Sequence, residues 1–203
     1  MWIDVIQNSE RWYELRKGKI TMSHGGDIMA NDGKAFGNPA KEYAEKVALE
    51  QVTGERDETG SFKNSYMDRG NELEPTARDL YEAETFSKVT NGGFHYLDDL
   101  GDSPDGRVGE KGCIEIKCVI PKTHWKRLKK GGYDLSYKWQ IQGHLWIGNC
   151  DWCDFVQYCP EMPPNKRLYI YRVERDEEMI NAMKVRFELF RAEVANNVKI
   201  LNS

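Results

Sequence analysis

The sequence predicts an α/β protein in which a central mixed sheet is flanked by helices. Two kinds of pattern support this class. Residues 113–118 alternate between two sets of side chains, which is typical of a strand with two different faces. Several other segments repeat apolar residues at helical spacing. Because no Pro- or Gly-rich linker interrupts the chain of 203 residues, we expect one domain, residues 1–203.

The N-terminal part carries signals for two short helices. Asn8 or Ser9 can cap the first helix, and Gly18 can end it. Thr21 or Ser23 can then open a second helix.

Two longer helices are predicted before the strands. Pro39 is placed to begin a helix that Gly54 ends. Residues 55–63 are polar and predict a loop. The next helix is predicted over residues 71–84, with Pro75 tolerated only in its first turn.

The second half of the chain alternates strands and helices. Residues 94–97, 155–159 and 168–173 are predicted strands. A helix capped by Asp134 or Ser136 is predicted as far as residue 146. A closing helix, capped by Asp176, is predicted to bury an apolar row formed by Ile180, Met183, Phe187, Phe190 and Val194.

Composition predicts a soluble, intracellular protein without membrane association. No apolar run approaches the roughly 20 residues that cross a bilayer. The N-terminus lacks the basic and apolar regions of a signal peptide. Five cysteines, an odd number, favour reduced thiols over disulfides. Cys150 and Cys153 have the spacing of a metal-binding or redox pair, but the further ligands of a complete site are not evident.

The segment around which the chain is organised joins a turn to a strand. Ser-Pro-Asp-Gly at residues 103–106 is turn chemistry, because Pro fixes one torsion and Asp-Gly tolerates the left-handed conformation. Glu115 and Lys117 lie on one face of the strand that follows. We therefore expect Asp105 to fold back toward Glu115, which brings two carboxylates and one ammonium group together.

Such a cluster suits metal-dependent hydrolysis of a phosphodiester. The carboxylates of Asp105 and Glu115, with the backbone carbonyl of Ile116, are hard oxygen ligands of the kind that Mg²⁺ prefers. Lys117 could orient the attacking water or neutralise the phosphate. The simpler alternative is an exposed strand whose Glu and Lys pair across a hairpin, since the pattern is short and permissive.

Basic residues gather directly after this strand, although the net charge of the chain is -4. The segment 122–130 holds Lys122, Lys126, Arg127, Lys129 and Lys130 and contains no acid. Such a stripe could follow a DNA backbone, because Lys and Arg neutralise phosphates. The alternative is a solvated helix face.

A second phosphate site is indicated near the N-terminus. Ser23 at a helix N-terminus, with Arg16 nearby, would offer free N–H groups, a hydroxyl and a guanidinium to a phosphate. The alternatives are an ordinary helix cap and a surface arginine.

The turn-and-strand pattern resembles the PD-(D/E)XK nuclease superfamily. Four further blocks resemble one branch of it, the phage lambda-type exonucleases, also called the YqaJ viral recombinase family. Each block is weak alone, but their order and spacing are specific. The blocks are residues 12–23 (WYELRKGKITMS), 70–82 (GNELEPTARDLYE), 131–142 (GGY to QIQ) and 154–160 (DFV to CP).

This resemblance implies a restriction-endonuclease-like core and further roles for single residues. Arg16 and Ser23 are implied to grip the 5'-terminal phosphate of the degraded strand. Glu74 is implied to be an additional acid that helps to hold a metal or its water, with Glu72 as its rival.

Three more residues complete the predicted site. Gln142 is implied to face the metal site and to bond a water or a phosphate oxygen, with Gln140 as its rival. Ser103 and Tyr137 are further candidates for contacts to DNA.

The function implied by the resemblance is a Mg²⁺-dependent, processive 5'-to-3' exonuclease of double-stranded DNA, with Mn²⁺ as a possible substitute ion. It would leave a 3' single strand for a single-strand annealing protein in phage-type recombination. A ring-shaped homotrimer and the cytoplasm of a bacterial host are implied as well. The alternatives are a restriction-like endonuclease, which would cut closed circular DNA, and a noncatalytic scaffold that binds DNA ends.

Overall fold

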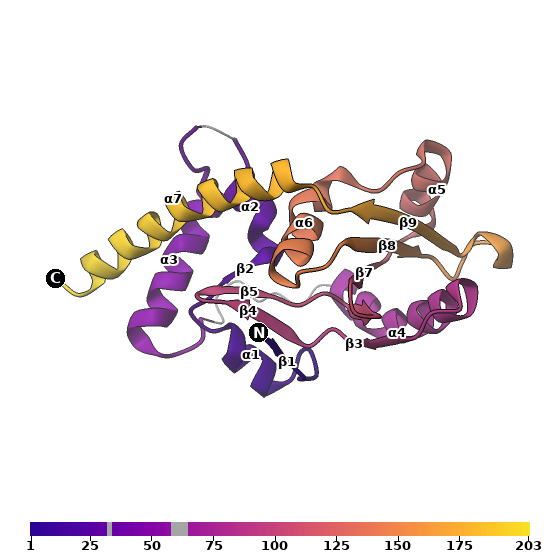
Figure 1. Ribbon diagram of the computed structural model, residues 1–203, viewed down its shortest axis with the longest axis horizontal. Helices are drawn as coiled ribbons and strands as arrows, with labels where there is room; N and C mark the ends of the chain where they lie inside the picture. Colours follow the sequence, from indigo (N-terminus) through magenta and orange to yellow (C-terminus); the bar gives the residue numbers. More distant parts are fainter. Residues whose placement is uncertain (32–33, 58–64) are drawn as a thin grey trace.

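Two mixed sheets organise the computed structural model, which describes residues 1–31, 34–57 and 65–203 (Figure 1). Within these residues the larger sheet has the strand order β3 (Val89–Asn91), β6 (Gly106–Val108), β7 (Gly112–Cys118), β8 (Trp152–Tyr158) and β9 (Leu168–Glu174). Strands β7 and β8 run parallel, and the other neighbours are antiparallel. The predicted mixed sheet is therefore confirmed.

The smaller sheet leads into the turn that holds Asp105. Its order is β1 (Trp2–Ile3), β4 (Phe94–Leu97), β5 (Leu100–Asp102) and β2 (Ile20–Thr21). Strand β5 belongs to this sheet and β6 to the larger one, so residues 103–105 connect the two sheets. The turn is thereby placed where both sheets meet.

Helices cover both faces of the larger sheet. Helix α4 (Ser65–Thr85) packs on one face, where Tyr81 joins Ile114 and Ile116 in an apolar cluster. Helix α6 (Lys138–Ile147) packs on the other face, where its Ile141 and Leu145 contact the cluster of Cys113 and Phe155.

The strand at residues 113–118 has the predicted alternation of side chains. The prediction that one of its faces is open to solvent is wrong. Glu115 is only 1% exposed, because α6 covers the face that we expected to be open. Cys113, on the same face, is also buried, together with Cys150 and Cys153, and all three are free thiols.

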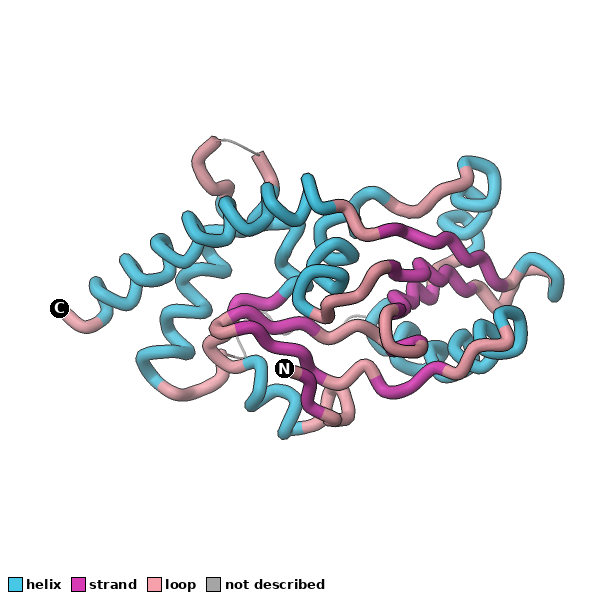
Figure 2. The backbone as a smooth tube through the Cα atoms, viewed as in Figure 1, coloured by secondary structure: helices cyan, strands magenta, loops and turns pink. Residues whose placement is uncertain are grey.

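Three helices lie together at one end of the molecule (Figure 2), and their buried apolar side chains form most of a third cluster. Helix α7 (Glu177–Leu201) lies against α3 (Asn38–Thr53) and contacts α2 (Gly25–Met29). The predicted apolar row of α7 is buried from Ile180 to Val194, which confirms it as core.

Several predicted helix ends are confirmed by their caps. The Ser9 hydroxyl accepts the Trp12 N–H at 3.3 Å at the start of α1 (Glu10–Arg16). Gly54, with φ of 70°, ends α3 in the left-handed region that favours glycine. The Asp176 carboxylate accepts the Met179 N–H at 3.0 Å and caps α7.

One prediction about helices is wrong, and another is confirmed in part. Helix α4 begins at Ser65, so Pro75 lies in the interior of the helix and not in its first turn. In the interior a proline removes one backbone hydrogen bond. Thr21 is the N-cap residue of the 3-10 helix Met22–His24, which leads directly into α2, so the second helical segment opens at one of the two predicted residues, although no side-chain hydrogen bond caps it. Ser23 lies inside this 3-10 helix. Of the predicted loop 55–63, residues 58–63 lie outside the described residues.

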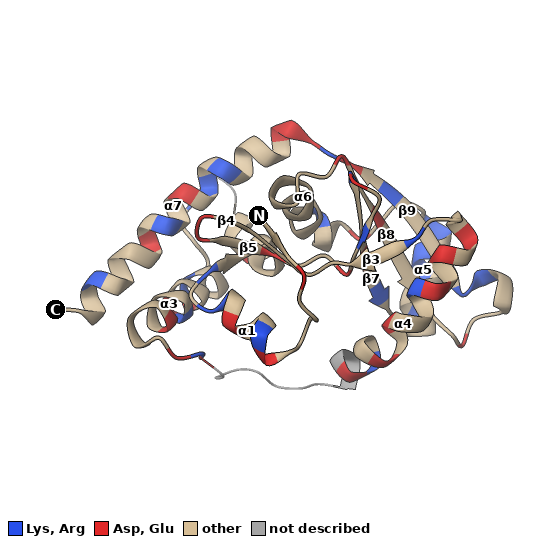
Figure 3. Ribbon diagram, turned by 60° about the horizontal axis from the view of Figure 1, so that its bottom comes forward, with Lys and Arg blue, Asp and Glu red and all other residues tan. Residues whose placement is uncertain are grey.

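Charged residues of both signs are interspersed along most helices, as α7 shows in Figure 3. Helix α5 (Pro121–Lys130) differs, because all five of its Lys and Arg residues lack an acidic neighbour on the same helix. The 3-10 helices Leu135–Tyr137 and Pro164–Lys166 complete the elements. None of the helices in residues 1–31, 34–57 and 65–203 is long and apolar enough to cross a membrane.

Candidate active site

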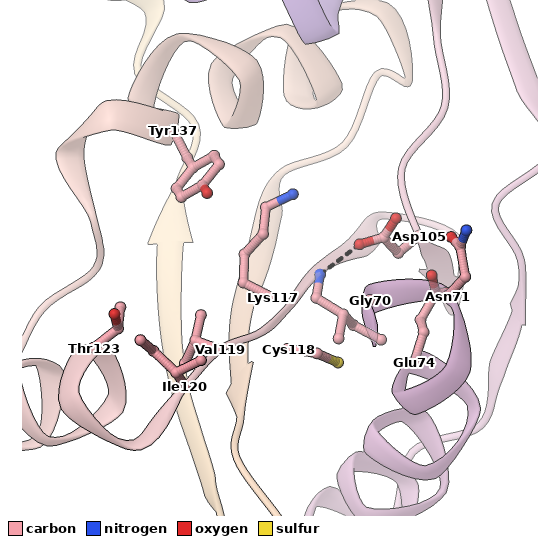
Figure 4. Close-up of a pocket in the computed structure, with 11 residues that line it drawn as sticks. Gly70, Asn71, Glu74, Asp105, Lys117, Cys118, Val119, Ile120, Thr123 and Tyr137 are labelled. Carbon is pink, nitrogen blue, oxygen red and sulfur yellow. Dashed lines mark hydrogen bonds between the residues drawn. The ribbon is translucent and has the colours of Figure 1, made fainter. Parts of the chain in front are cut away.

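Asp105 completes the edge of β7 where β6 ends. Strand β6 pairs with β7 only as far as Gly106 opposite Ile114. Beyond that point the Asp105 N–H donates to the Ile114 carbonyl at 3.1 Å, and its carboxylate accepts the Ile116 N–H at 2.6 Å (Figure 4). Since the N–H and C=O of one strand residue point to the same edge, the Ile116 carbonyl faces the same gap as Asp105.

Three side chains from other elements hold this turn in place. The Trp12 ring N–H donates to the Ser103 hydroxyl at 2.9 Å. The carbonyls of the next two residues accept hydrogen bonds of 2.7 Å from Gln7 and from Arg78. The position of Asp105 is therefore fixed by α1, by α4 and by the chain that precedes α1.

Glu115 is held at both carboxylate oxygens. One oxygen contacts the Lys117 ammonium at 2.6 Å and accepts the Gln140 side-chain N–H at 2.8 Å. The other lies 3.0 Å from a ring nitrogen of His144. Burial by itself would raise the pKa of Glu115, but Lys117 and His144 outweigh it and lower that pKa to about 2.

The neighbouring charges act differently on Asp105. Burial, and then the negative charges of Glu115 and Glu74, raise its pKa well above the ordinary value. Burial lowers the pKa of Lys117, but the two carboxylates outweigh it, so that this pKa is raised. The site thus gathers more carboxylates than its single lysine offsets, and an added cation would relieve their repulsion.

A hollow of about 620 Å³ is lined by Asp105, Lys117 and Glu74, and we call it the carboxylate pocket; Glu115 does not line it and lies buried in contact with Lys117. Figure 4 shows Glu74 and Asn71 on α4, Asp105 beside them, and Lys117 between Asp105 and Tyr137. The Lys117 nitrogen lies 4.7 Å from the centre of the Tyr137 ring. Glu74 therefore lines the pocket, as expected, and bonds Arg78 at 2.8 Å. Glu72 is exposed and does not line it.

The oxygen atoms of this pocket fit a hard cation. Asp105 and Glu74 offer carboxylates and Ile116 offers its carbonyl, while the buried carboxylate of Glu115 lies behind Lys117, which lines the pocket. Within the described part of the chain, no three His, Cys, Asp or Glu side chains are close enough to enclose a metal by themselves. This set instead counts a backbone carbonyl and leaves positions to water, which is how Mg²⁺ is usually bound.

The glutamine prediction is wrong in its geometry. The Gln142 side chain donates to the Glu174 carbonyl at 2.9 Å and accepts the Asp176 N–H at 3.0 Å, so it joins the end of β9 to α7. It is Gln140, the rival candidate, that contacts Glu115. The two residues are two positions apart on α6 and so point to different sides of the helix.

Sequence reasoning missed two further residues of the site, His144 and Asp102. His144 lies 2.7 Å from Asp102 through its other ring nitrogen and is 1% exposed. Burial lowers the pKa of His144, but Asp102 and Glu115 outweigh it and raise that pKa well above its ordinary value. One signal was available: Gln140 and His144 are four residues apart, which places them on the same face of a helix.

The two predicted phosphate residues contact each other, but only Arg16 lines a second hollow, which we call the basic pocket; Ser23 is not among its lining residues. The Arg16 guanidinium, which lines it, donates to the Ser23 hydroxyl at 3.1 Å and stacks over the Trp12 ring at 4.3 Å. One carboxylate, that of Glu50, lines the pocket against a larger set of cations. These cations are Arg16, Lys17, Lys19, Lys46 and Arg56.

A third hollow, the bridging pocket, lies between the other two. It shares Asn71, Glu74 and Asp105 with the carboxylate pocket and Asn8 with the basic pocket. The three pockets therefore form a series. Of the two further DNA-contact candidates, Tyr137 lines the carboxylate pocket, whereas the Ser103 hydroxyl is occupied by Trp12.

A mixed sheet that carries an Asp, a Glu and a Lys in this arrangement defines the class of PD-(D/E)XK-type nucleases, which hydrolyse phosphodiester bonds. Residues 11–151 match the family model of the YqaJ-like viral recombinase domain. The chain belongs to this family.

Solved structures agree with this assignment. An alkaline exonuclease from Laribacter hongkongensis is 32% identical, with a TM-score of 0.86 and 96% of each chain covered. Its complex with dAMP is 33% identical, has the same TM-score, and covers 95% of this chain and 96% of the other. A phage-related exonuclease from Haemophilus somnus 129PT shares the fold, with a TM-score of 0.70 and 18% identity over 94% of this chain and 98% of its own. No curated protein matches the sequence.

Proposed function

We propose that this protein is a Mg²⁺-dependent exonuclease that degrades the 5'-ended strand of double-stranded DNA processively and leaves a 3' single strand. The observation that carries the proposal is the series of pockets, in which a cluster of carboxylates and a cluster of cations are joined by one intermediate hollow. An acidic site for hydrolysis beside a basic site for a terminal phosphate is what an enzyme acting on strand ends requires.

In the carboxylate pocket, Asp105, Glu115 and the Ile116 carbonyl would hold the metal, and Glu74 would hold it directly or through water. Mn²⁺ is the expected substitute. The ion would supply a bound water of lowered pKa and positive charge for the transition state. Lys117 is placed to hold that water or the scissile phosphate, because its ammonium contacts Glu115 and borders the pocket.

The basic pocket would set the direction of digestion. A 5'-terminal phosphate carries more negative charge than an internal phosphodiester, so the cations around Arg16 would favour it. Arg16 would bind it together with the Ser23 hydroxyl. The complex of the Laribacter hongkongensis exonuclease with dAMP is a precedent in a relative for binding of a nucleotide with one phosphate.

The wider assembly is part of the proposal and rests on what the resemblance to the family implies. A ring-shaped homotrimer around the duplex would explain processivity, since DNA cannot leave a closed channel. The basic stripe of α5 begins next to the carboxylate pocket, which Thr123 lines, and would follow the backbone of the duplex. A single-strand annealing protein would then take the 3' strand in phage-type recombination, in the cytoplasm of a bacterial host.

Digestion of three DNA substrates tests this proposal: a linear duplex with 5' phosphates, the same duplex with 5' hydroxyls, and a closed circular plasmid. Each is incubated with Mg²⁺ and with EDTA. We expect metal-dependent loss of the linear DNA alone, faster with the 5' phosphate. Cutting of the circle would identify an endonuclease instead, and binding of ends without digestion would identify a scaffold.

A further inference from the structure

A buried chain of three polar side chains ends at Glu115, which contacts Lys117 at the edge of the carboxylate pocket. His144 of α6 lies between Asp102 of β5 and Glu115 of β7, at 2.7 Å and 3.0 Å. Each of the three residues is 1% exposed. Because burying charged groups is costly unless they are paired and hydrogen-bonded, three such residues in contact call for an explanation beyond packing.

The arrangement leaves Asp102 with one partner. Its first oxygen contacts His144, and among the described residues its second oxygen meets no hydrogen-bond donor. Asp102 therefore acts on the site through the His144 ring, whose tilt and hydrogen-bonding nitrogen it determines.

The same ring determines how Glu115 is turned. A carboxylate with one restrained oxygen can still rotate, whereas Glu115 is restrained at both, by Lys117 and Gln140 on one side and by His144 on the other. Among these three contacts the one from His144 is fully buried, whereas Gln140 and Lys117 are partly exposed. Removing it would free the Glu115 carboxylate to turn within its cavity.

We propose that His144, oriented by Asp102, is a positioning residue that sets the direction in which Glu115 presents its carboxylate to the metal. The inference rests on the proposed metal-dependent function and deepens it. Substituting a residue that hydrogen-bonds a metal ligand typically costs about 10- to 100-fold in metal affinity or activity.

Two substitutions at position 144 separate this role from a structural one. The side-chain amide nitrogen of Gln extends about as far as the ring nitrogen that faces Glu115, so His144→Gln can keep that hydrogen bond. The shorter amide of Asn reaches only the position of the nitrogen that faces Asp102, so His144→Asn loses the contact to Glu115. If the ring merely filled space, both variants would lose stability, the Asn variant more, but their Mn²⁺ affinities would be equal.

The first measurement is Mn²⁺ binding to the protein without DNA, from the electron paramagnetic resonance signal of the free ion. We expect His144→Asn to weaken Mn²⁺ binding by about 10- to 100-fold and to raise the Mg²⁺ concentration that half-saturates digestion. His144→Gln should retain much more of the affinity. KM for DNA should change less than kcat, because the basic pocket is untouched.

His124→Gln is the matched control. His124 is also a fully buried histidine, and it bonds the Lys166 carbonyl at 2.8 Å and Gln157 at 3.1 Å without touching a carboxylate of the site. The His124→Gln variant should have a lower melting temperature than the unsubstituted protein and should bind Mn²⁺ equally well. Equal Mn²⁺ affinity in the Asn and Gln variants would overturn the inference. If the unsubstituted protein neither binds Mn²⁺ nor digests DNA, the proposed function itself fails.

Discussion

The carboxylate pocket and the basic pocket are built in different ways. In the first, Asp105 and Glu115 are each held by several hydrogen bonds from strands and helices, and Glu115 is 1% exposed. In the second, the cations come from α1, α3 and the segments between helices, and Lys17 pairs with Glu14, three residues away.

The contrast reflects what each pocket would do. Hydrolysis requires metal ligands that are held within a fraction of an ångström of their productive positions. Buried hydrogen bonds orient the carboxylates of this pocket accordingly. Holding a terminal phosphate requires positive charge over a wider space, which partly exposed side chains can supply. Substitutions in the first pocket should therefore change the rate of hydrolysis, and those in the second should change the choice of substrate.

The largest expected effect comes from Asp105→Asn. The Asn oxygen can still accept the Ile116 N–H, so the turn is kept while the negative charge is lost. We expect single-turnover hydrolysis to fall by at least about 100-fold, because metal ligation contributes several kcal/mol to the transition state. DNA affinity, from fluorescence anisotropy with Ca²⁺ in place of Mg²⁺, should be retained. Undiminished turnover would remove Asp105 from the metal site.

An intermediate effect is expected for Arg16→Ala, and it should depend on the substrate. A charge-assisted hydrogen bond to phosphate is worth about 1.5–3 kcal/mol, so digestion of 5'-phosphorylated ends should slow by roughly 10- to 100-fold. Ends with a 5' hydroxyl should lose much less. The measurement is the ratio of the digestion rates on 5'-phosphorylated and 5'-hydroxyl ends for one protein preparation. Unfolded protein in the preparation lowers both rates equally and does not change the ratio.

Arg11→Ala is the control for Arg16, because Arg11 is exposed on the same helix and lines none of the three pockets. It should leave the ratio unchanged. Equal slowing of both ends by Arg16→Ala would make Arg16 a structural residue.

The smallest effect on catalysis is expected for Gln142→Ala, which tests the corrected geometry. Its loss leaves the Glu174 carbonyl and the Asp176 N–H without partners, so the free energy of unfolding should fall by about 1–3 kcal/mol while kcat of the folded protein stays the same. Gln140→Ala should do the opposite and lower kcat with little effect on unfolding. Denaturant unfolding and kcat, measured for both variants, check this pair, and a larger kcat loss in Gln142→Ala would restore the original assignment.

Much of the site could be predicted from the sequence because its central pattern is local. The spacing of Glu115 and Lys117 places both on one face of any extended strand, and the turn residues before the strand direct Asp105 back toward it. The caps at Ser9 and Asp176 are local in the same sense, since each side chain bonds a backbone N–H three residues away.

The tertiary structure decided what depends on segments far apart in the chain. Gln140 and Gln142 are both compatible with the pattern of α6, and only the packing of that helix on the sheet turns Gln140 toward Glu115. The contact of Asp102 with His144 joins residues 42 positions apart, which no periodicity reveals. The sequence alone therefore predicted the acidic motif, because strand and turn geometry depend on neighbouring residues. Which side chains orient the carboxylates of that motif was decided by packing between distant elements.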